Sequence, residues 1–246
     1  MKDIAVLGCG PAGLLAAHAI ERAGHNPVII SKRVQSVMPG AQYIHHEIPG
    51  IDVEESQVDF IKIGTKEGYA QKVYGNAQAR CSWDLFPVGT RPCWSMKELY
   101  GRLWDKYSGI VMDRELGLED FGDIADSYPL VFSSVPAQLL CHEPETCVFT
   151  GQPIWVKVRG TWYEERNYIS YNGHPLTPWY RQSLLFGQRT TEYGHEVYNG
   201  QKGIKPLWTT CRCHPQLHRI GRFGKWQKGV LVTDAFKEVQ RAMQQV

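Results

Sequence analysis

The first thirty residues begin with a short apolar run and a glycine cluster. A mostly apolar stretch follows, and a second short apolar run ends the segment. Ile4, Val6 and Leu7 belong to the first run, which is typical of a buried parallel strand. A helix is expected over residues 11–23, with Gly24 ending it, and the segment PVII supplies a second strand. The pattern therefore predicts a β-α-β unit at the start of the chain.

A second amphipathic pattern predicts a helix over residues 96–107. Ser95 and Glu98 have the spacing of a capping box, and Leu99, Leu103 and Tyr107 continue one apolar stripe. Residues 50–110 do not read as part of a Rossmann sheet.

Residues 147–193 are rich in Val, Ile, Tyr, Trp and Thr, with turn residues in the segment YNGHP. This composition predicts an antiparallel sheet, which we interpret as a substrate-binding layer. At the end of the chain, GVLV (229–232) predicts a short strand before a helix. Thr233 or Asp234 would cap that helix, and Phe236, Val239 and Met243 form its apolar stripe.

The glycine cluster VLGCGPAGLL (6–15) carries the pattern G-x-G-x-x-G between the first strand and the first helix. Gly8 permits a sharp turn, Gly10 lets the backbone approach a pyrophosphate, and Gly13 lets helix and strand pack closely. The helix that begins at Pro11 and Ala12 directs its positive N-terminus at the phosphates. The segment therefore predicts a dinucleotide site.

One position departs from this pattern. An acidic residue normally closes the second strand and binds ribose hydroxyls, but Ser31 stands there, followed by Lys32 and Arg33. Either these two cations hold the 2′-phosphate of NADP, or the site takes FAD through a ribose contact that is weaker or supplied elsewhere. The glycines do not decide between these alternatives.

Composition and charge narrow the class of protein. With 246 residues, 43% hydrophobic, the chain suits one large globular domain or two small ones. A formal net charge of +2, with a mildly basic last quarter, does not by itself indicate nucleic acid or membrane binding. We see no secretory signal and no membrane-spanning segment, and seven cysteines are an odd number for a disulfide framework. We therefore expect reduced thiols in a cytoplasmic protein.

The segment CRCHPQLHRIG brings together Cys211, Cys213, His214 and His218, which are residue types that bind zinc. The segment lacks the usual C-x-x-C spacing, so we predict no metal site and expect the cysteines to pack near a cofactor.

A turn followed by a C-terminal helix, as in residues 219–243, resembles the closing motif of flavoproteins of the glutathione-reductase-like fold. The resemblance extends to the UDP-galactopyranose mutase and amine oxidase branch. It rests on Gly221-Arg222-Phe223-Gly224, GAQYIHHEIPG (40–50), YPLVFSSVPAQLL (128–140) and YNGHPLTPWYRQSLLFG (171–187). No single segment is specific, but their order along the chain matches the branch.

The resemblance implies FAD rather than NADP, with Gln42, Gly221, Arg222, Phe223 and Gly224 joining the cofactor site. It also implies an α/β fold in which a Rossmann-like FAD-binding domain (1–48, 108–140 and 214–246) is interleaved with a minimal α+β substrate-binding lobe (49–107 and 141–213). His45 aligns with the second histidine of the mutase segment, and Arg181 is expected near the substrate.

His45 or His46 would transfer a proton or stabilise charge at the flavin, unless both are ordinary surface histidines. Arg181, beside Trp179 and Tyr180 as substrate contacts, would clamp an anionic group, unless it is a strand arginine paired with a nearby acid.

The sequence thus favours a FAD-dependent oxidoreductase that oxidises a C–N or C–H bond of an amine or amino-acid-like group. Small phage-encoded flavoproteins of similar appearance suggest an alternative, a FAD-dependent lyase or oxidase acting on an amino-acid-modified thymine in DNA. Two further alternatives are a UDP-sugar mutase-like enzyme that uses reduced FAD and a non-catalytic flavin or nucleotide-binding module. The expected partner is a small molecule or a modified nucleotide. DNA remains open, and the sequence leaves the oligomeric state undetermined.

Overall fold

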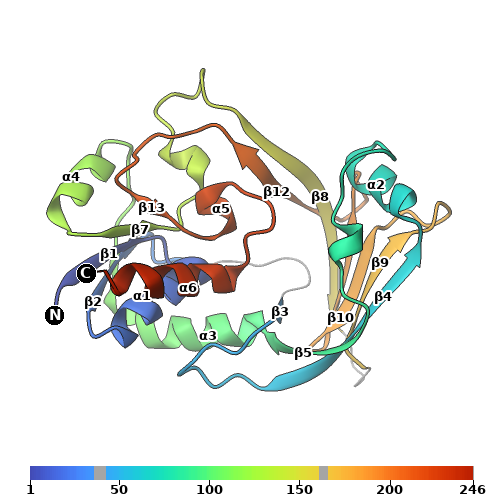
Figure 1. The fold of residues 1–246 in the computed structure, drawn as a ribbon, viewed down its shortest axis with the longest axis horizontal. Helices are drawn as coiled ribbons and strands as arrows, with labels where there is room; N and C mark the ends of the chain where they lie inside the picture. The colour runs from blue at the N-terminus through green and yellow to red at the C-terminus, as the bar shows by residue number, and fades with distance from the viewer. Residues whose placement is uncertain (36–42, 161–165, 246) are drawn as a thin grey trace. The chain divides into compact units, whose positions relative to one another are not determined.

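A computed structural model describes residues 1–35, 43–160 and 166–245 of the chain. The chain divides into two compact units that interleave along the sequence (Figure 1). Unit 1 comprises Met1–Val37, Tyr100–Gly151 and Pro206–Val246, and unit 2 comprises Met38–Leu99 and Gln152–Lys205. The sequence-based division placed its boundaries at 48, 107, 140 and 213, whereas these units meet after residues 37, 99, 151 and 205.

Unit 1 contains a five-stranded parallel sheet in the order β13-β7-β1-β2-β6. Its strands are β1 (Asp3–Leu7), β2 (Asn26–Ser31), β6 (Val111–Asp113), β7 (Val131–Ser133) and β13 (His218–Arg219). The first strand is central and the order reverses beside it, which is the Rossmann-like arrangement. The α/β fold class expected from the sequence is therefore confirmed.

Helices accompany this sheet. They are α1 (Pro11–Arg22), α3 (Met96–Tyr107), α4 (Asp120–Ser127), α5 (Gly221–Lys225) and α6 (Val232–Met243), with short 3-10 turns η2 (Ser108–Ile110) and η3 (Ala137–Leu140). Helix α1 lies beside α6, where the rings of His18 and Phe236 stack at 5.8 Å (Figure 1). Ile4 to Leu7 in β1 are fully buried, as a central parallel strand requires.

Unit 2 is built on an eight-stranded sheet in the order β12-β8-β11-β10-β9-β4-β5-β3, in which β4 and β9 run parallel. Its strands are β3 (Tyr43–Ile44), β4 (Glu55–Gly64), β5 (Gly89–Ser95), β8 (Phe149–Gly160), β9 (Tyr168–Gly173), β10 (Arg181–Leu185), β11 (Gln188–Tyr193) and β12 (Gln201–Thr209). Helix α2 (Lys66–Tyr74) and the turn η1 (Trp83–Leu85) supply Tyr69 and Trp83 to the core of the unit.

Most of the expected elements are confirmed. The β-α-β unit, the helix over 96–107 and the antiparallel pairing of β8, β9, β10 and β11 all occur. The capping box is also present in part, since the backbone N–H of Glu98 donates to Ser95 Oγ at 3.2 Å.

The strand predicted at 229–232 is wrong. Gly229 has a positive φ of 84°, and helix α6 already begins at Val232. The capping prediction is also wrong, because Leu231 is the N-cap and Asp234 lies in the first turn, where its carboxylate accepts the Leu231 N–H at 2.7 Å. The apolar run reflects burial of the helix entry rather than a sheet ladder, which periodicity alone does not distinguish in short segments. The apolar stripe of Phe236, Val239 and Met243 is buried as expected.

None of the helices in the described part of the chain combines the length and the apolar character needed to cross a membrane.

Candidate functional site

The glycine cluster forms the turn between β1 and α1 in unit 1. Gly8 has a φ of 94°, which strongly favours glycine, and a Cβ on Gly13 would lie 1.9 Å from the Gly8 carbonyl oxygen. Gly10 is the N-cap of α1, and among the described residues no side chain makes a capping hydrogen bond there. This helix N-terminus is therefore open to an anion.

The C-terminal turn lies beside this glycine loop, although more than 200 residues separate the two in the sequence. Gly221 has a φ of 69°, and a Cβ on it would approach the Cβ of Ala12 to 2.6 Å. A Cβ on Gly224 would lie 2.7 Å from the Ser133 carbonyl oxygen. The structure thus brings together Gly8, Gly10, Pro11, Ala12, Gly13 and Gly221, which the sequence analysis assigned to one cofactor site.

The other two residues of this turn have observable roles within the fold. Arg222 donates from Nε to the Val230 carbonyl oxygen at 3.2 Å, which ties the turn to the entry of α6. Phe223 is 43% exposed, and its ring packs against Trp226. Contacts of these two side chains with a cofactor stay a prediction.

The end of β2 offers a carboxylate that the sequence analysis missed. Ser31 pairs in register with Asp113 at the end of the neighbouring strand β6. The Asp113 Oδ1 atom accepts the Arg33 N–H at 3.1 Å, and Lys32 forms an exposed ion pair with Glu115 at 2.5 Å. An acid therefore stands beside the position where the usual ribose-binding acid is replaced by Ser31.

His45 and His46 follow strand β3 in unit 2, whereas Gln42 lies outside the described residues. His45 is partly buried, and its ring meets the Tyr43 ring edge-on at 4.7 Å. Burial lowers the pKa of His45, and the nearby His46 and Arg181 lower it further. A neutral imidazole at neutral pH is able to accept a proton.

Arg181 is part of a buried charge cluster, which we define as Tyr180, Arg181, Glu192 and Lys205. Arg181 Nη1 lies 3.1 Å from Glu192 Oε1, and Lys205 pairs with the other carboxylate oxygen. Burial raises the pKa of Glu192, but Lys205 and Arg181 outweigh this and hold it at about 2. Arg181 is therefore a strand arginine paired with a nearby acid, which is one of the two alternatives considered for it.

The charge cluster still carries an excess positive charge, because two cations share one carboxylate. The buried Nε of Arg181 has no hydrogen-bond partner among the described residues. The Tyr180 hydroxyl is directed inward and donates to Glu192 Oε2 at 2.9 Å. Contacts of Tyr180 and Arg181 with a substrate therefore stay a prediction.

The opposite side of the same strands carries a cationic hollow of about 220 Å³. It is lined by Lys157, Arg159, Trp179, Gln182, Arg189, Thr191 and Tyr193. Because strand residues alternate between faces, Gln182 lines the hollow while its neighbour Arg181 faces Glu192. Trp179 therefore lies with this hollow rather than with the charge cluster, and no carboxylate among the described residues lines it.

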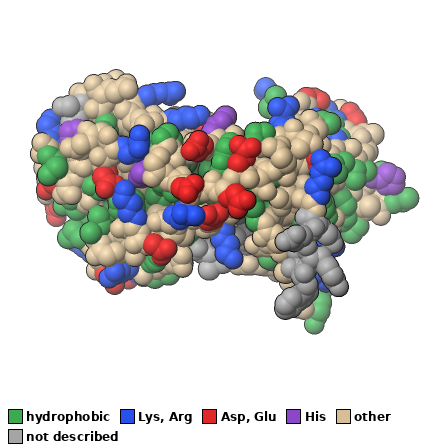
Figure 2. Space-filling view, turned by 90° about the horizontal axis from the view of Figure 1, so that it is seen from below, with side chains coloured by type: hydrophobic (Ala, Val, Ile, Leu, Met, Phe, Trp, Pro, Cys, Tyr) green, Lys and Arg blue, Asp and Glu red, His purple; other side chains and the backbone are tan. Residues whose placement is uncertain are grey.

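Figure 2 shows a face of the molecule on which acidic and basic side chains are intermixed. A polyanion such as DNA favours a continuous basic surface. The face in Figure 2 therefore does not present the continuous basic surface that a polyanion favours.

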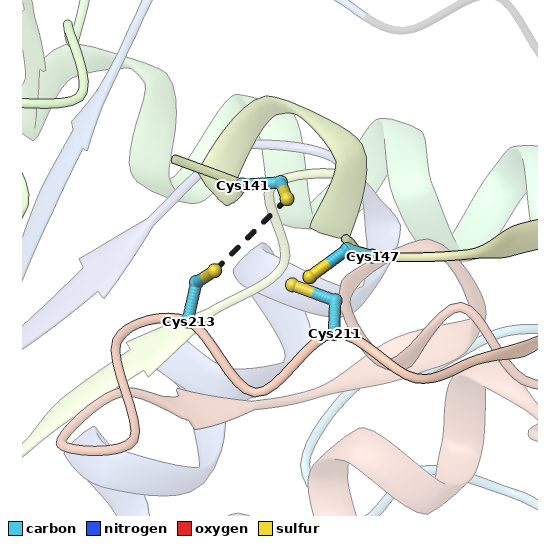
Figure 3. Close-up of side chains that lie close together, drawn as sticks. All are labelled: Cys141, Cys147, Cys211 and Cys213. Atoms are coloured by element: carbon cyan, nitrogen blue, oxygen red, sulfur yellow. Dashed lines mark hydrogen bonds between the residues drawn. The ribbon is translucent and has the colours of Figure 1, made fainter. Parts of the chain in front are cut away.

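Four cysteines of unit 1 lie together (Figure 3). The sulfur atoms of Cys141, Cys147, Cys211 and Cys213 all lie within 4.8 Å of one another. The sequence analysis considered Cys211 and Cys213 with His214 and His218. In the structure, His214 Nε2 instead lies 3.4 Å from His142 Nδ1, and the ring of His218 packs against Phe132.

The comparison with solved structures is the one that bears on the fold. No protein-family model matches the chain, and no curated protein does. Among solved structures, reduced UDP-galactopyranose mutase matches with a TM-score of 0.54 and 12% identity, over 99% of this chain and 95% of that one.

Two further structures match over 99% of this chain. A flavoprotein/dehydrogenase from Cytophaga hutchinsonii has a TM-score of 0.54 and 9% identity over 77% of its own chain. BrvH, a flavin-dependent halogenase from Brevundimonas sp. BAL3, has a TM-score of 0.51 and 10% identity over 71% of its chain. The fold of this protein is therefore similar to the fold of these flavoproteins.

Two features of the structure, Asp113 and the pairing of two distant cysteine segments, were not predicted from the sequence. The signal for Asp113 was weak, because it closes a three-residue strand 80 residues after Arg33. The sequence contains a C-x-C motif at 211–213, but the cysteines that lie beside it, Cys141 and Cys147, precede it by about seventy residues.

Proposed function

We propose that the protein is a FAD-dependent oxidoreductase that oxidises a C–N or C–H bond of an amine or amino-acid-like group. The observation that carries the proposal is the meeting of the glycine loop and the Gly221 turn at the uncapped N-terminus of α1. The similarity of the fold to the flavoproteins above supports it.

The residues present fit the cofactor. The N-terminus of α1 at Gly10 would hold the pyrophosphate, because its N–H groups have no side-chain cap in the described part of the chain. The close approach of Gly221 to Ala12 leaves no room for a side chain at position 221 of the C-terminal turn. Asp113 and Ser31 would bind the ribose hydroxyls. Asp113 would then take the role of the acid that is usually found at the end of β2.

When bound, FAD supplies a two-electron acceptor for hydride from the substrate carbon. The protein's part is to bind and orient the substrate and to manage its proton. His45 would accept the proton of a substrate ammonium group on a ring nitrogen, since its lowered pKa keeps the imidazole neutral near pH 7. The free amine is the form that gives up a hydride readily.

An anionic end of the substrate, such as a carboxylate, has two places to bind in unit 2. One is the charge cluster, with its excess positive charge and the unpaired Nε of Arg181. The other is the cationic hollow, where Lys157 and Arg159 lie beside the rings of Trp179 and Tyr193. Both favour a substrate that carries a negative charge.

The first experiment is an absorbance spectrum of the purified protein, followed by mass analysis of the compound that denaturation releases. We expect oxidised-flavin bands and free FAD, and loss of both in Gly10→Val with the fold retained by circular dichroism. A colourless protein that takes up NADPH but not FAD would contradict the proposal and make Lys32 and Arg33 the residues of interest.

The substrate is tested next by anaerobic bleaching of the flavin with a panel of amines and amino acids. We expect Lys157→Gln and Arg159→Gln to raise the substrate concentration needed for half reduction, whereas Lys237→Gln, exposed on α6, should not. Turnover only after prior reduction of the flavin, without net oxidation, would favour the mutase-like alternative. Salt-dependent binding of duplex or single-stranded DNA would favour the modified-thymine alternative.

A further inference from the structure

We propose that Cys141, Cys147, Cys211 and Cys213 form a structural zinc site in unit 1, which we call the thiolate site. This inference is independent of the cofactor. Structural zinc sites are closed by four protein ligands, and four thiolates are one of the common ligand sets.

The distances fit a single metal ion. Four sulfur atoms around one tetrahedral zinc, at about 2.3 Å from the metal, are separated from each other by roughly 3.8 Å. Here Cys213 Sγ and Cys141 Sγ are 4.0 Å apart, and all four sulfurs lie within 4.8 Å of one another. The sulfurs point inward from two separate segments of the chain (Figure 3), and all four cysteines are free thiols.

The local backbone explains how the unusual C-x5-C and C-x-C spacings still converge. After Cys141, the chain folds back through a turn in which the Cys147 N–H donates to the Glu143 carbonyl oxygen at 3.0 Å. The second segment is joined to the first because the Thr210 N–H donates to the Val148 carbonyl oxygen at 3.1 Å. Both pairs of thiols are thereby presented to one point.

The surroundings also suit a thiolate-bound cation. Binding of Zn²⁺ by four thiols releases four protons and leaves a site of net charge −2, which favours a cation nearby. Arg219 Nη2 lies 3.5 Å from Cys211 Sγ and donates to the Cys213 carbonyl oxygen at 2.5 Å. Such a contact orients the ligand segment from outside the metal's own shell.

A path for the metal is open on one side. Cys147 and Cys213 line a hollow of about 450 Å³, together with His142, Glu143 and Arg212. Cys147 is partly exposed there, whereas Cys141, Cys211 and Cys213 are buried, with Cys211 only 1% exposed. An ion therefore reaches the site from solution and is then shielded from it.

The thiolate site would stabilise the segment that leads to the C-terminal turn described above. Residues 210–217 connect β12 to β13 and contain no helix or strand, and only Ile220 separates β13 from Gly221. A metal that joins Cys211 and Cys213 to the segment of Cys141 and Cys147 fixes this connection. The thiolate site thus holds the segment that leads to the turn beside Ala12.

The test is elemental analysis of the purified, desalted full chain after growth in zinc-supplemented medium. We expect one zinc per chain whether or not the preparation contains flavin, so this result does not depend on the proposed function. Stoichiometric iron instead of zinc would overturn the assignment of the metal. Disulfides among the four cysteines, found by mass analysis after thiol blocking, would overturn the site.

Matched variants then locate the metal. Cys147→Ser and Cys211→Ser should each lose the zinc, whereas Cys81→Ser should retain it, because Cys81 lies outside the thiolate site in unit 2. Cys81 and Cys147 are both partly buried, which makes this pair of variants a matched comparison. Equal zinc content in all three variants would overturn the proposal.

If the serine variants fail to fold, the wild-type chain supplies the same test. Chelation should lower the midpoint of thermal unfolding, and added Zn²⁺ should restore it. Added Co²⁺ should give the long-wavelength d–d bands of tetrahedral thiolate ligation, beyond the absorption of flavin. A chelated protein that stays folded and takes up neither ion would overturn the proposal.

Discussion

The surroundings of His45 lower its pKa, and this effect can be tested directly. Burial is the largest cause of its lowered pKa, with His46 and Arg181 adding to the effect. We expect its ring to titrate below the ordinary value of 6.5. Replacing the exposed His46 by Gln should raise this pKa only in part, because burial remains. Proton NMR titration measures it, with His45→Gln assigning the resonance, and titration at or above 6.5 would contradict this account.

Glu192 is the residue on which the charge cluster depends. Its side chain is 4% exposed, and its single carboxylate pairs with both Arg181 and Lys205. Glu192→Gln leaves two cations uncompensated, so we expect a loss of about 3–5 kcal/mol in the free energy of unfolding. Urea titration measures the loss, and Glu115→Gln, which breaks an exposed pair with Lys32, should cost at most about 1 kcal/mol.

The Glu192 carboxyl also makes the free energy of unfolding depend on pH. Its folded-state pKa of about 2 lies below the ordinary value of 4.5, so its contribution is fully present above 4.5. That contribution is lost as the pH falls from 4.5 through about 2. Urea titrations of wild type and Glu192→Gln should therefore converge over this range, and a constant difference between them would contradict the low pKa.

At the scale of elements, two glycines in helices predict opposite outcomes for the same substitution. A Cβ on Gly13 of α1 would lie 1.9 Å from the Gly8 carbonyl oxygen, whereas one on Gly101 of α3 meets nothing within 4 Å. Gly13→Ala must push α1 away from β1 and should destabilise the protein and weaken cofactor retention. Gly101→Ala should stabilise it by about 0.5–1 kcal/mol, because alanine restricts the unfolded chain.

Thermal unfolding of both variants checks this pair. A Gly13→Ala protein as stable as wild type would show that α1 and β1 are not packed as closely as described. Destabilisation by Gly101→Ala would show that its side of α3 is more crowded than described.

The elements also show which features the sequence could predict. The β-α-β unit and the cap at Ser95 depend on residues a few positions apart, so local patterns were sufficient. The pairing of Ser31 with Asp113 depends on sheet order, and that of Arg181 with Glu192 on strand register. No local pattern contains that information. The strand expected at 229–232 failed for the related reason that a short apolar run indicates burial without indicating which element is buried.

At the scale of the whole molecule, the candidate cofactor site is assembled from three distant parts of one unit. The glycine loop lies at residues 8–13, Asp113 closes β6, and the Gly221 turn belongs to the last third of unit 1. A ligand that contacts all three binds only the folded chain. It therefore adds its binding free energy to the stability of the whole unit.

This gives a test that requires no knowledge of the substrate. Adding FAD to the flavin-free protein at about 100 times its dissociation constant should stabilise the fold by about 2.7 kcal/mol. The midpoint of thermal unfolding, followed by far-ultraviolet circular dichroism, should rise accordingly in wild type and in Gly101→Ala. Gly10→Val should show no rise, because a side chain at the N-cap of α1 keeps the pyrophosphate from the helix N-terminus. A rise with NADPH and none with FAD would mean that the three segments serve a different dinucleotide.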